Sequence, residues 1–214
     1  MDKIKKWRKG YLVLLLIGNL IGVCLYLFDE GPIIESLSYF TIISNILVFF
    51  FFTYVLFKKG ELNQKERSMK AAVTISIMVT FIVFQTLLAP TIQGELSFWD
   101  SFLCHTYTPL LVLLDYFLFD KKGMLKYRDI PYWLSIPLGY FVYANLYALL
   151  GGTFTYDETT TRYPYFFINP DLIGWAMVLV FVLILSLFVV GLSFLFVFVD
   201  HKIVQEKKVI EKET

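Results

Sequence analysis

The chain has 214 residues, of which 57% are hydrophobic and 19% aromatic, and its mean hydropathy is +0.66. This composition leaves too little polar surface for a soluble protein of this length. The formal net charge is only +1, from 19 basic and 18 acidic residues.

Six apolar segments follow one another along the chain, and each is long enough to form a transmembrane helix. A hydrocarbon core of ~30 Å requires ~20 helical residues, because lipid offers backbone polar groups no partners and a helix pairs them internally. The expected fold is all-α, a single six-helix polytopic membrane domain over residues 1–214, with sequential helices antiparallel. The predicted spans are residues 11–28, 38–57, 71–89, 101–119, 132–150 and 173–199.

The distribution of Lys and Arg predicts the orientation of these spans. Five precede the first span, five follow the second, four follow the fourth, four follow the sixth, and only Arg162 lies on the other side. Cytoplasmic loops carry such an excess, so both termini are expected in the cytoplasm. We interpret the basic side as a topology signal and a contact for anionic membrane lipids, with no binding of nucleic acid.

The outer connection, residues 151–172, is long, opens with a glycine pair and is rich in Tyr and Phe. Long loops are usually functional or disordered, and these aromatic residues suit a membrane interface. The sequence leaves the role of this loop open.

Polar residues inside the spans are the candidates for chemistry, because such side chains usually face a partner or a cavity. Thr41, Ser44 and Asn45 in the second span have helical spacing and share one face. His105 is the one histidine predicted inside a span, and both helices run inward from the outer boundary. Thr41 and His105 are therefore expected at similar depth, and two further polar residues reach a comparable level, Gln85 and Asn145.

Pro109 is predicted to kink the fourth span beside His105. Proline lacks the N–H that would bond the carbonyl of residue 105, and its ring pushes against that carbonyl. A kink opens space and frees an acceptor, as a pocket in the outer half of the bundle would need. Proline kinks in membrane helices also serve packing alone.

Three segments resemble a known family: YFTIISNILV around Thr41, HTYTPLLVLLDYFLF from His105 and RYPYFFINPD from Arg162. They are similar to segments of the androgen-induced-gene and ADTRP family of multi-pass membrane hydrolases and its bacterial six-span relatives. The resemblance implies a lipid esterase of a bacterial plasma membrane, acting on fatty acid esters of hydroxy fatty acids. Thr41 and His105 match the essential threonine and histidine, whereas the YPYFF segment brings no catalytic role with it.

The chemistry expected of this pair is that of a serine-hydrolase-like threonine esterase. A neutral imidazole within ~2.6 to 3.2 Å can take the proton of a threonine hydroxyl and make it nucleophilic. We expect Ser44 and Asn45 to donate to the oxyanion and to bind substrate with Gln85 and Asn145. One buried histidine is below the three protein ligands of catalytic zinc, and phosphate-loop or HExxH motifs are absent. The sequence thus predicts neither a metal nor a soluble cofactor.

Structural roles remain open for the same residues. Intramembrane Thr, Ser, Asn and His side chains often bond their own helix or bridge two helices. No residue that could orient the imidazole is evident. Asp115 lies about 15 Å deeper along the helix. It is either a carboxylate that pairs helices or snorkels to the interface, or part of a proton path. The alternative function is a non-enzymatic binder or transporter of a small amphipathic molecule. The acyl chain of the substrate and the oligomeric state are left open.

Overall fold

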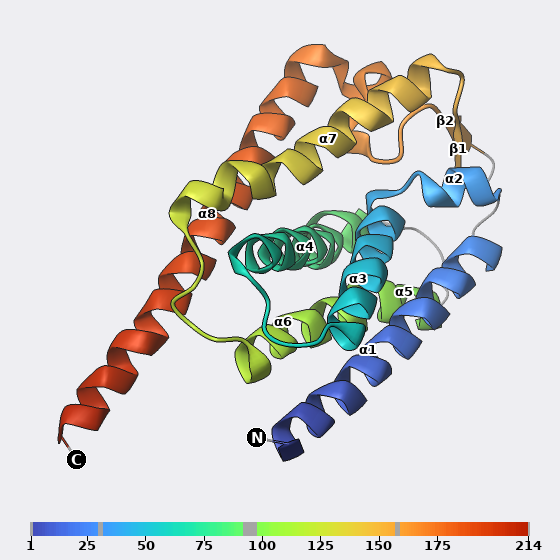
Figure 1. Ribbon diagram of the computed structural model, residues 1–214. Helices are drawn as coiled ribbons and strands as arrows, with labels where there is room; N and C mark the ends of the chain where they lie inside the picture. Colours follow the sequence, from blue (N-terminus) through green and yellow to red (C-terminus); the bar gives the residue numbers. More distant parts are fainter. Residues whose placement is uncertain (1, 30–31, 92–97, 157–158, 214) are drawn as a thin grey trace.

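The computed structural model describes residues 2–29, 32–91, 98–156 and 159–213. Its α-helices are α1 (Asp2–Asp29), α2 (Ile33–Leu37), α3 (Phe40–Phe57), α4 (Gln64–Val83), α5 (Phe98–Phe102), α6 (Thr108–Phe119), α7 (Ile130–Leu149) and α8 (Pro170–Glu213) (Figure 1). Two π-helical segments, η1 (Phe84–Leu88) and η3 (Leu103–Tyr107), continue α4 and join α5 to α6. Short 3-10 turns are η2 (Ala89–Thr91), η4 (Tyr127–Asp129) and η5 (Phe166–Ile168).

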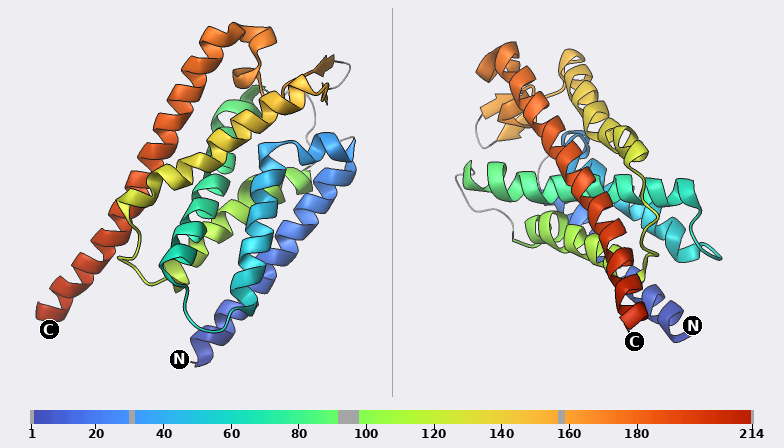
Figure 2. Two further views of the ribbon diagram at one scale, coloured as in Figure 1. Left: turned by 45° about the horizontal axis from the view of Figure 1, so that its top comes forward. Right: turned by 90° about the vertical axis from the view of Figure 1, so that its left-hand side faces the viewer.

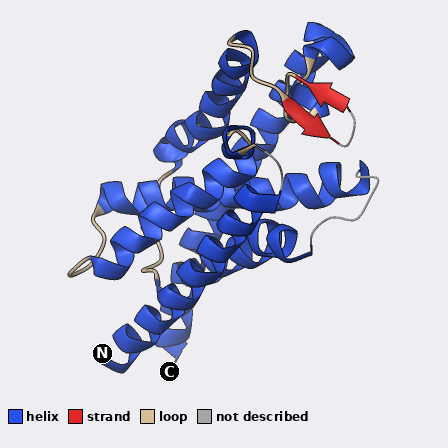
Figure 3. Cartoon of the chain, turned by 90° about the vertical axis from the view of Figure 1, so that its right-hand side faces the viewer, coloured by secondary structure: helices blue, strands red, loops and turns tan. Residues whose placement is uncertain are grey.

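The connection between α7 and α8, predicted to be an outer loop, contains a small antiparallel hairpin. Strand β1 (Phe154–Tyr156) pairs with β2 (Thr159–Thr161), and Phe154 lies opposite Thr161. The backbone N–H of Thr155 donates to the buried carboxylate of Glu35 in α2 at 2.6 Å. This bond ties the loop to the start of the second span, at the end of the molecule away from both termini (Figure 3).

Five helical segments are long and apolar enough to cross a membrane within the described part of the chain: Lys6–Phe28, Phe40–Phe57, Gln64–Thr91, Phe98–Phe119 and Pro170–Glu206. They correspond to five of the six predicted spans. The second begins two residues later than predicted, because Ser38 and Tyr39 form the turn between α2 and α3. Helix α7 lies where the remaining span was predicted and has 20 residues, but its tyrosines, prolines and polar side chains lower its mean hydropathy.

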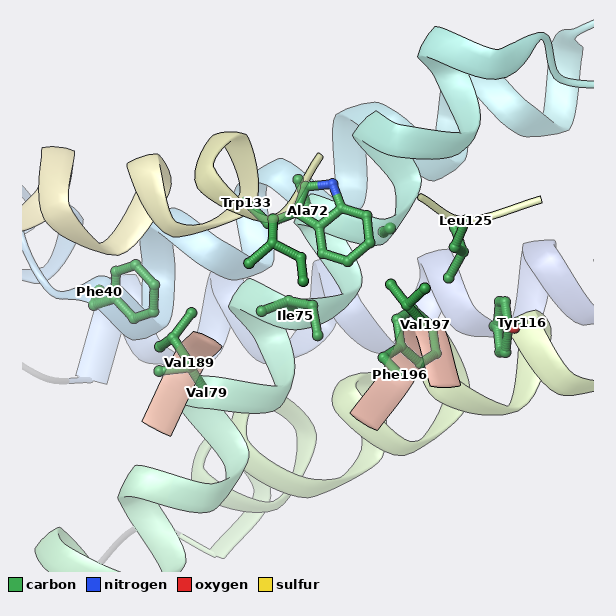
Figure 4. Packing of buried hydrophobic residues seen from close by; sticks show 12 residues of the cluster. Phe40, Ala72, Ile75, Val79, Tyr116, Leu125, Trp133, Val189, Phe196 and Val197 are labelled. Carbon is green, nitrogen blue, oxygen red and sulfur yellow. The ribbon is translucent and has the colours of Figure 1, made fainter. Parts of the chain in front are cut away.

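Helix α4 is central in the bundle. It contacts α3, α6, α7 and α8, and its residues from Lys70 to Thr80 are all buried. Helices α1, α3 and α6 lie on one side of it, and α7 and α8 lie on the other (Figures 1 and 2). The main core is formed where α4 meets α7 and α8, through residues such as Ala72, Ile75, Val79, Trp133, Val189 and Val197 (Figure 4).

Two glycines let α1 approach the π-helical segment η3 closely. Gly18 and Gly22 are four residues apart and so share one face of α1. A Cβ on Gly22 would lie 2.7 Å from Cβ of Leu103, and one on Gly18 would lie 2.1 Å from the ring of Tyr107. Small residues at this spacing are the common device for close packing of membrane helices, which relies on van der Waals contact.

An ion-pair cluster joins three helices at the end of the bundle that carries both termini. Lys70 of α4 pairs with Asp115 of α6 and, at 2.6 Å, with Asp120 just after it. Arg8 of α1 lies 3.3 Å from Asp115 and 3.1 Å from Asp120. Lys70 and Asp115 are only 2% and 0% exposed. Of the roles left open for Asp115, the structure therefore favours the helix-pairing carboxylate.

Replacing Gly22 by Ala should destabilise the protein, since the added methyl group meets Leu103 near its backbone, where little can move. Overpacking of this kind costs about 1–3 kcal/mol. The matched control is Gly10→Ala in the same helix, where the new Cβ would meet open space among the described residues. Thermal unfolding in detergent measures the difference, and equal midpoints for the two variants would contradict the close contact.

Replacing Lys70 by Met should be strongly destabilising, because it leaves the buried carboxylate of Asp115 and the half-buried carboxylate of Asp120 with one cation fewer. Removing one partner of a buried ion pair typically costs about 3–5 kcal/mol. The control is Lys202→Met, which breaks an exposed pair with Glu206 at 3.8 Å and should leave the unfolding midpoint nearly unchanged. A midpoint for Lys70→Met that equals the control would show that the cluster contributes nothing to stability.

Candidate active site

Thr41 and His105 lie in contact near the end of the bundle opposite the termini. Thr41 is the second residue of α3, and its Oγ1 is 3.2 Å from Nε2 of His105 in η3. Each residue is 5% exposed. A π-helical segment lies where the kink beside His105 was predicted, and it ends just before Pro109, the second residue of α6. The two residues that sequence analysis selected thus form one hydrogen-bonded pair.

A backbone carbonyl orients the imidazole. Nδ1 of His105 is 3.1 Å from the carbonyl oxygen of Ser101, one turn earlier. A carbonyl can only accept, so Nδ1 carries the hydrogen and Nε2 presents its lone pair to the Thr41 hydroxyl. Phe84 of η1 stacks on the ring, with centroids 3.6 Å apart and planes at 19°. No residue type in the sequence identifies this orienting group, because every residue carries a backbone carbonyl.

Asn45 joins the two backbone segments that carry the pair. Its amide nitrogen donates to the carbonyl of Thr41 at 2.8 Å and to that of Cys104 at 3.2 Å. Asn19 of α1 donates in turn to the Asn45 side-chain oxygen at 2.9 Å. Both amide hydrogens of Asn45 are thereby used, so this geometry does not support the predicted role of Asn45 as an oxyanion donor.

Ser44 also supports the backbone of Thr41. Its hydroxyl donates to the Thr41 carbonyl at 3.0 Å and is 2.8 Å from the hydroxyl of Thr80 in α4. Ser44 is fully buried. The structure therefore places Ser44 behind the pair, in the packing between α3 and α4, and does not support its predicted role as an oxyanion donor.

The other two predicted substrate-binding residues lie away from the pair. Gln85 is exposed and donates to the hydroxyl of Thr106 at 3.3 Å, while Asn145 donates to the carbonyl of Phe141 in its own helix at 2.7 Å. Among the described residues, the lining of the neighbouring pocket includes neither of them. Similar depth did not bring these side chains to one place, because they lie on other helix faces.

An apolar pocket of about 90 Å³ adjoins Thr41. It lies between the start of α3, the C-terminal half of α4, helices α7 and α8, and the turn η5. Besides Thr41 and Thr80, its walls include Phe40, Val79, Val83, Leu134, Phe141, Phe167, Leu185 and Val189. Figure 4 shows Phe40, Val79 and Val189 close together where these helices meet. The pocket therefore offers a hydrocarbon environment next to the threonine hydroxyl.

Tyr165 brings the outer loop into the site. Its hydroxyl accepts a hydrogen bond from the backbone N–H of Phe40 at 3.0 Å and interacts with both the backbone and the side chain of Thr41. Its ring lines the pocket. Burial raises the pKa of Tyr165, so the phenol is neutral at neutral pH. The YPYFF segment was the only sequence signal for this residue, and nothing in the sequence placed it beside Thr41.

Within the described ranges, no group of three or more His, Cys, Asp or Glu side chains is arranged to hold a metal ion. The sequence matches no protein-family model, and no curated protein or solved structure is significantly similar to it.

Replacing Asn45 by Leu should destabilise the protein, because it removes the side-chain donor to the buried carbonyl of Cys104 and the 2.9 Å acceptor of the Asn19 amide. The carbonyl of Thr41 keeps its bond from the Ser44 hydroxyl. Each unsatisfied buried group costs about 1–3 kcal/mol. The control is Asn145→Leu, which removes one bond within a helix at a half-buried position. The unfolding midpoint in detergent should fall several-fold further for Asn45→Leu than for the control. A larger fall for Asn145→Leu would contradict the bridging role of Asn45.

Proposed function

We propose that this protein is an intramembrane lipid-ester hydrolase in which Thr41 is the nucleophile and His105 the general base. The observation that carries the proposal is the 3.2 Å contact between Thr41 Oγ1 and a His105 ring whose other nitrogen is held by the Ser101 carbonyl. A hydroxyl, a base within reach and a group that orients the base are the parts of a nucleophilic hydrolase site.

The reaction follows from these positions. Nε2 of His105 takes the proton of the Thr41 hydroxyl as Oγ1 bonds to the ester carbonyl carbon, and the carbonyl oxygen becomes an oxyanion. When the carbonyl re-forms, the alcohol portion leaves with the proton from the imidazolium and the acyl group stays on Thr41. Water then gives a proton to Nε2 as its oxygen bonds to the acyl carbon. When the carbonyl re-forms, the bond to Oγ1 breaks, the imidazolium returns the proton to Thr41, and the fatty acid is released.

The pocket and the depth of the pair support a lipid substrate. The acyl chain would occupy the apolar pocket beside Thr41, while the ester carbonyl meets the pair and water enters from the headgroup region.

We infer six spans, with α7 as the fifth, both termini in the cytoplasm and a bacterial plasma membrane as the location. The common end of the two termini and the basic connections at that end support this orientation (Figure 2). The resemblance described above favours fatty acid esters of hydroxy fatty acids as substrates.

The proposal is tested by fatty acid release from a panel of long-chain esters, including esters of hydroxy fatty acids. Thr41→Val keeps the branched shape of Thr41 but removes the hydroxyl, and His105→Gln removes the base. Both variants should lose turnover by about 10³-fold or more, as expected when a member of a nucleophile and base pair is removed. The control is Thr86→Val, since Thr86 is exposed and bonds the carbonyl of Ile82 in its own helix.

Two outcomes would contradict the hydrolase. Wild-type protein that retains lipid tightly but releases no acid from any ester would favour the alternative, a binder or transporter of a small amphipathic molecule. Turnover that survives both substitutions would place the chemistry elsewhere in the chain.

A further inference from the structure

An ester hydrolase must stabilise the oxyanion that forms when the nucleophile attacks, and this requires donors within about 2.7–3.1 Å of that oxygen. The amide hydrogens of Asn45 are bound to carbonyls, and the Ser44 hydroxyl donates behind Thr41. Neither side chain is therefore available as the donor, and a donor is needed on the pocket side of Thr41, where the ester carbonyl would lie.

Tyr165 has its hydroxyl on that side. One lone pair of the hydroxyl accepts the N–H of Phe40 at 3.0 Å, and the hydroxyl also interacts with the side chains of Thr41 and Tyr140. In the free site the phenol hydrogen can donate to either of these hydroxyl oxygens, and it would turn to the ester oxygen when substrate binds. A hydroxyl has two lone pairs and one hydrogen, so accepting from Phe40 leaves the hydrogen of Tyr165 able to donate. The bond to Phe40 thus positions the phenol oxygen without using its hydrogen.

The ring of Tyr165 is fixed by other aromatic residues. It stacks on Phe167 with centroids 5.3 Å apart and planes at 8°. It also forms an edge contact with Tyr39 at 6.1 Å and a tilted contact with Tyr140 at 6.3 Å. Thr41 and Tyr165 both line the apolar pocket. An ester carbonyl attacked by Thr41 from within this pocket would lie within reach of the phenol hydrogen.

We propose that Tyr165 is a catalytic residue whose phenolic O–H donates a hydrogen bond to the oxyanion formed on attack by Thr41. The inference rests on the proposed hydrolase function. The carbonyl π electrons move to oxygen as the bond to Oγ1 forms, Tyr165 stabilises the negative charge, and the phenol keeps its proton when the carbonyl re-forms. The positive end of the α3 dipole lies at the same place and acts in the same direction.

This assignment gives the outer loop a chemical role. Residues 151–172 would supply one group of the active site while the membrane helices supply the other two. Two interactions of this loop then hold Tyr165 over α3. One is the backbone bond from Thr155 to Glu35, and the other is the ion pair of Arg162 with Asp171, whose two bonds measure 2.6 Å and 2.9 Å.

The test compares Tyr165→Phe with Tyr163→Phe, which removes a hydroxyl from a buried tyrosine two residues away in the same loop. With the long-chain ester that wild type hydrolyses best, Tyr165→Phe should lower kcat by about 10²–10³ with KM nearly unchanged, because the donor acts on charge that develops in the transition state. Tyr163→Phe should stay within about twofold of wild type, the scatter expected of a hydroxyl outside the site.

Two further measurements separate catalysis from folding. A non-hydrolysable ether analogue of the ester should bind Tyr165→Phe as it binds wild type, because the ether develops no oxyanion. Replacing Tyr165 by 3-fluorotyrosine keeps the shape but lowers the phenol pKa. The loss of kcat at high pH, as the phenol deprotonates, should then move to lower pH.

The results that would overturn the inference are distinct from those that would overturn the hydrolase. Tyr165 is not part of the mechanism if Tyr165→Phe keeps full kcat, or if 3-fluorotyrosine does not shift the pH at which kcat falls on the alkaline side. Loss of turnover in Thr41→Val would still support the hydrolase in that case. Weakened binding of the ether analogue by Tyr165→Phe would make the role structural. Wild-type protein without turnover would overturn both proposals.

Discussion

The site depends on how a membrane protein satisfies backbone carbonyls that an irregular helix leaves free. Lipid provides no partners for such groups, so side chains must provide them. Two carbonyls at or just before the π-helical segment accept from side chains: that of Ser101, near the end of α5, from His105, and that of Cys104, inside the segment, from Asn45. The first bond sets which nitrogen of His105 faces Thr41. The second ties the segment to α3. The bonds that satisfy these carbonyls therefore also fix the geometry of Thr41 and His105.

The rest of the bundle keeps this segment in place. Gly18 and Gly22 allow α1 to pack directly on η3, and Phe84, on the other π-helical segment, stacks on the imidazole. At the opposite end, Lys70 and Arg8 neutralise Asp115 and Asp120 and join α1, α4 and α6. Charge is thus paired at the end with the termini, whereas Thr41, Ser44 and Asn45 are joined by hydrogen bonds between neutral groups. A hydroxyl and an imidazole in a dry site interact more strongly than they would in water.

The pocket extends away from the pair toward α7 and α8, and α8 exposes many apolar side chains along its length. In a membrane those side chains would face lipid, so a hydrophobic ester would reach the pocket without leaving the hydrocarbon region. Tyr165 and Phe167 close the pocket from the outer loop. The proposed chemistry is then confined to the level where acyl chains end and water begins.

The sequence by itself determined the helical fold class, five of the spans and the similar depth of Thr41 and His105, because hydropathy, length and helical spacing are local properties. It also pointed to an irregular helix beside Pro109. Tertiary structure alone decided that Ser101 orients the imidazole, that Ser44 and Asn45 support the backbone, and that Gln85 and Asn145 lie elsewhere. Helical periodicity gives the depth of a side chain and its own face but does not say which neighbouring helix that face meets. Tyr165 was harder still to place, since a loop has no periodicity and only its bonds to α2 and α3 bring it to Thr41.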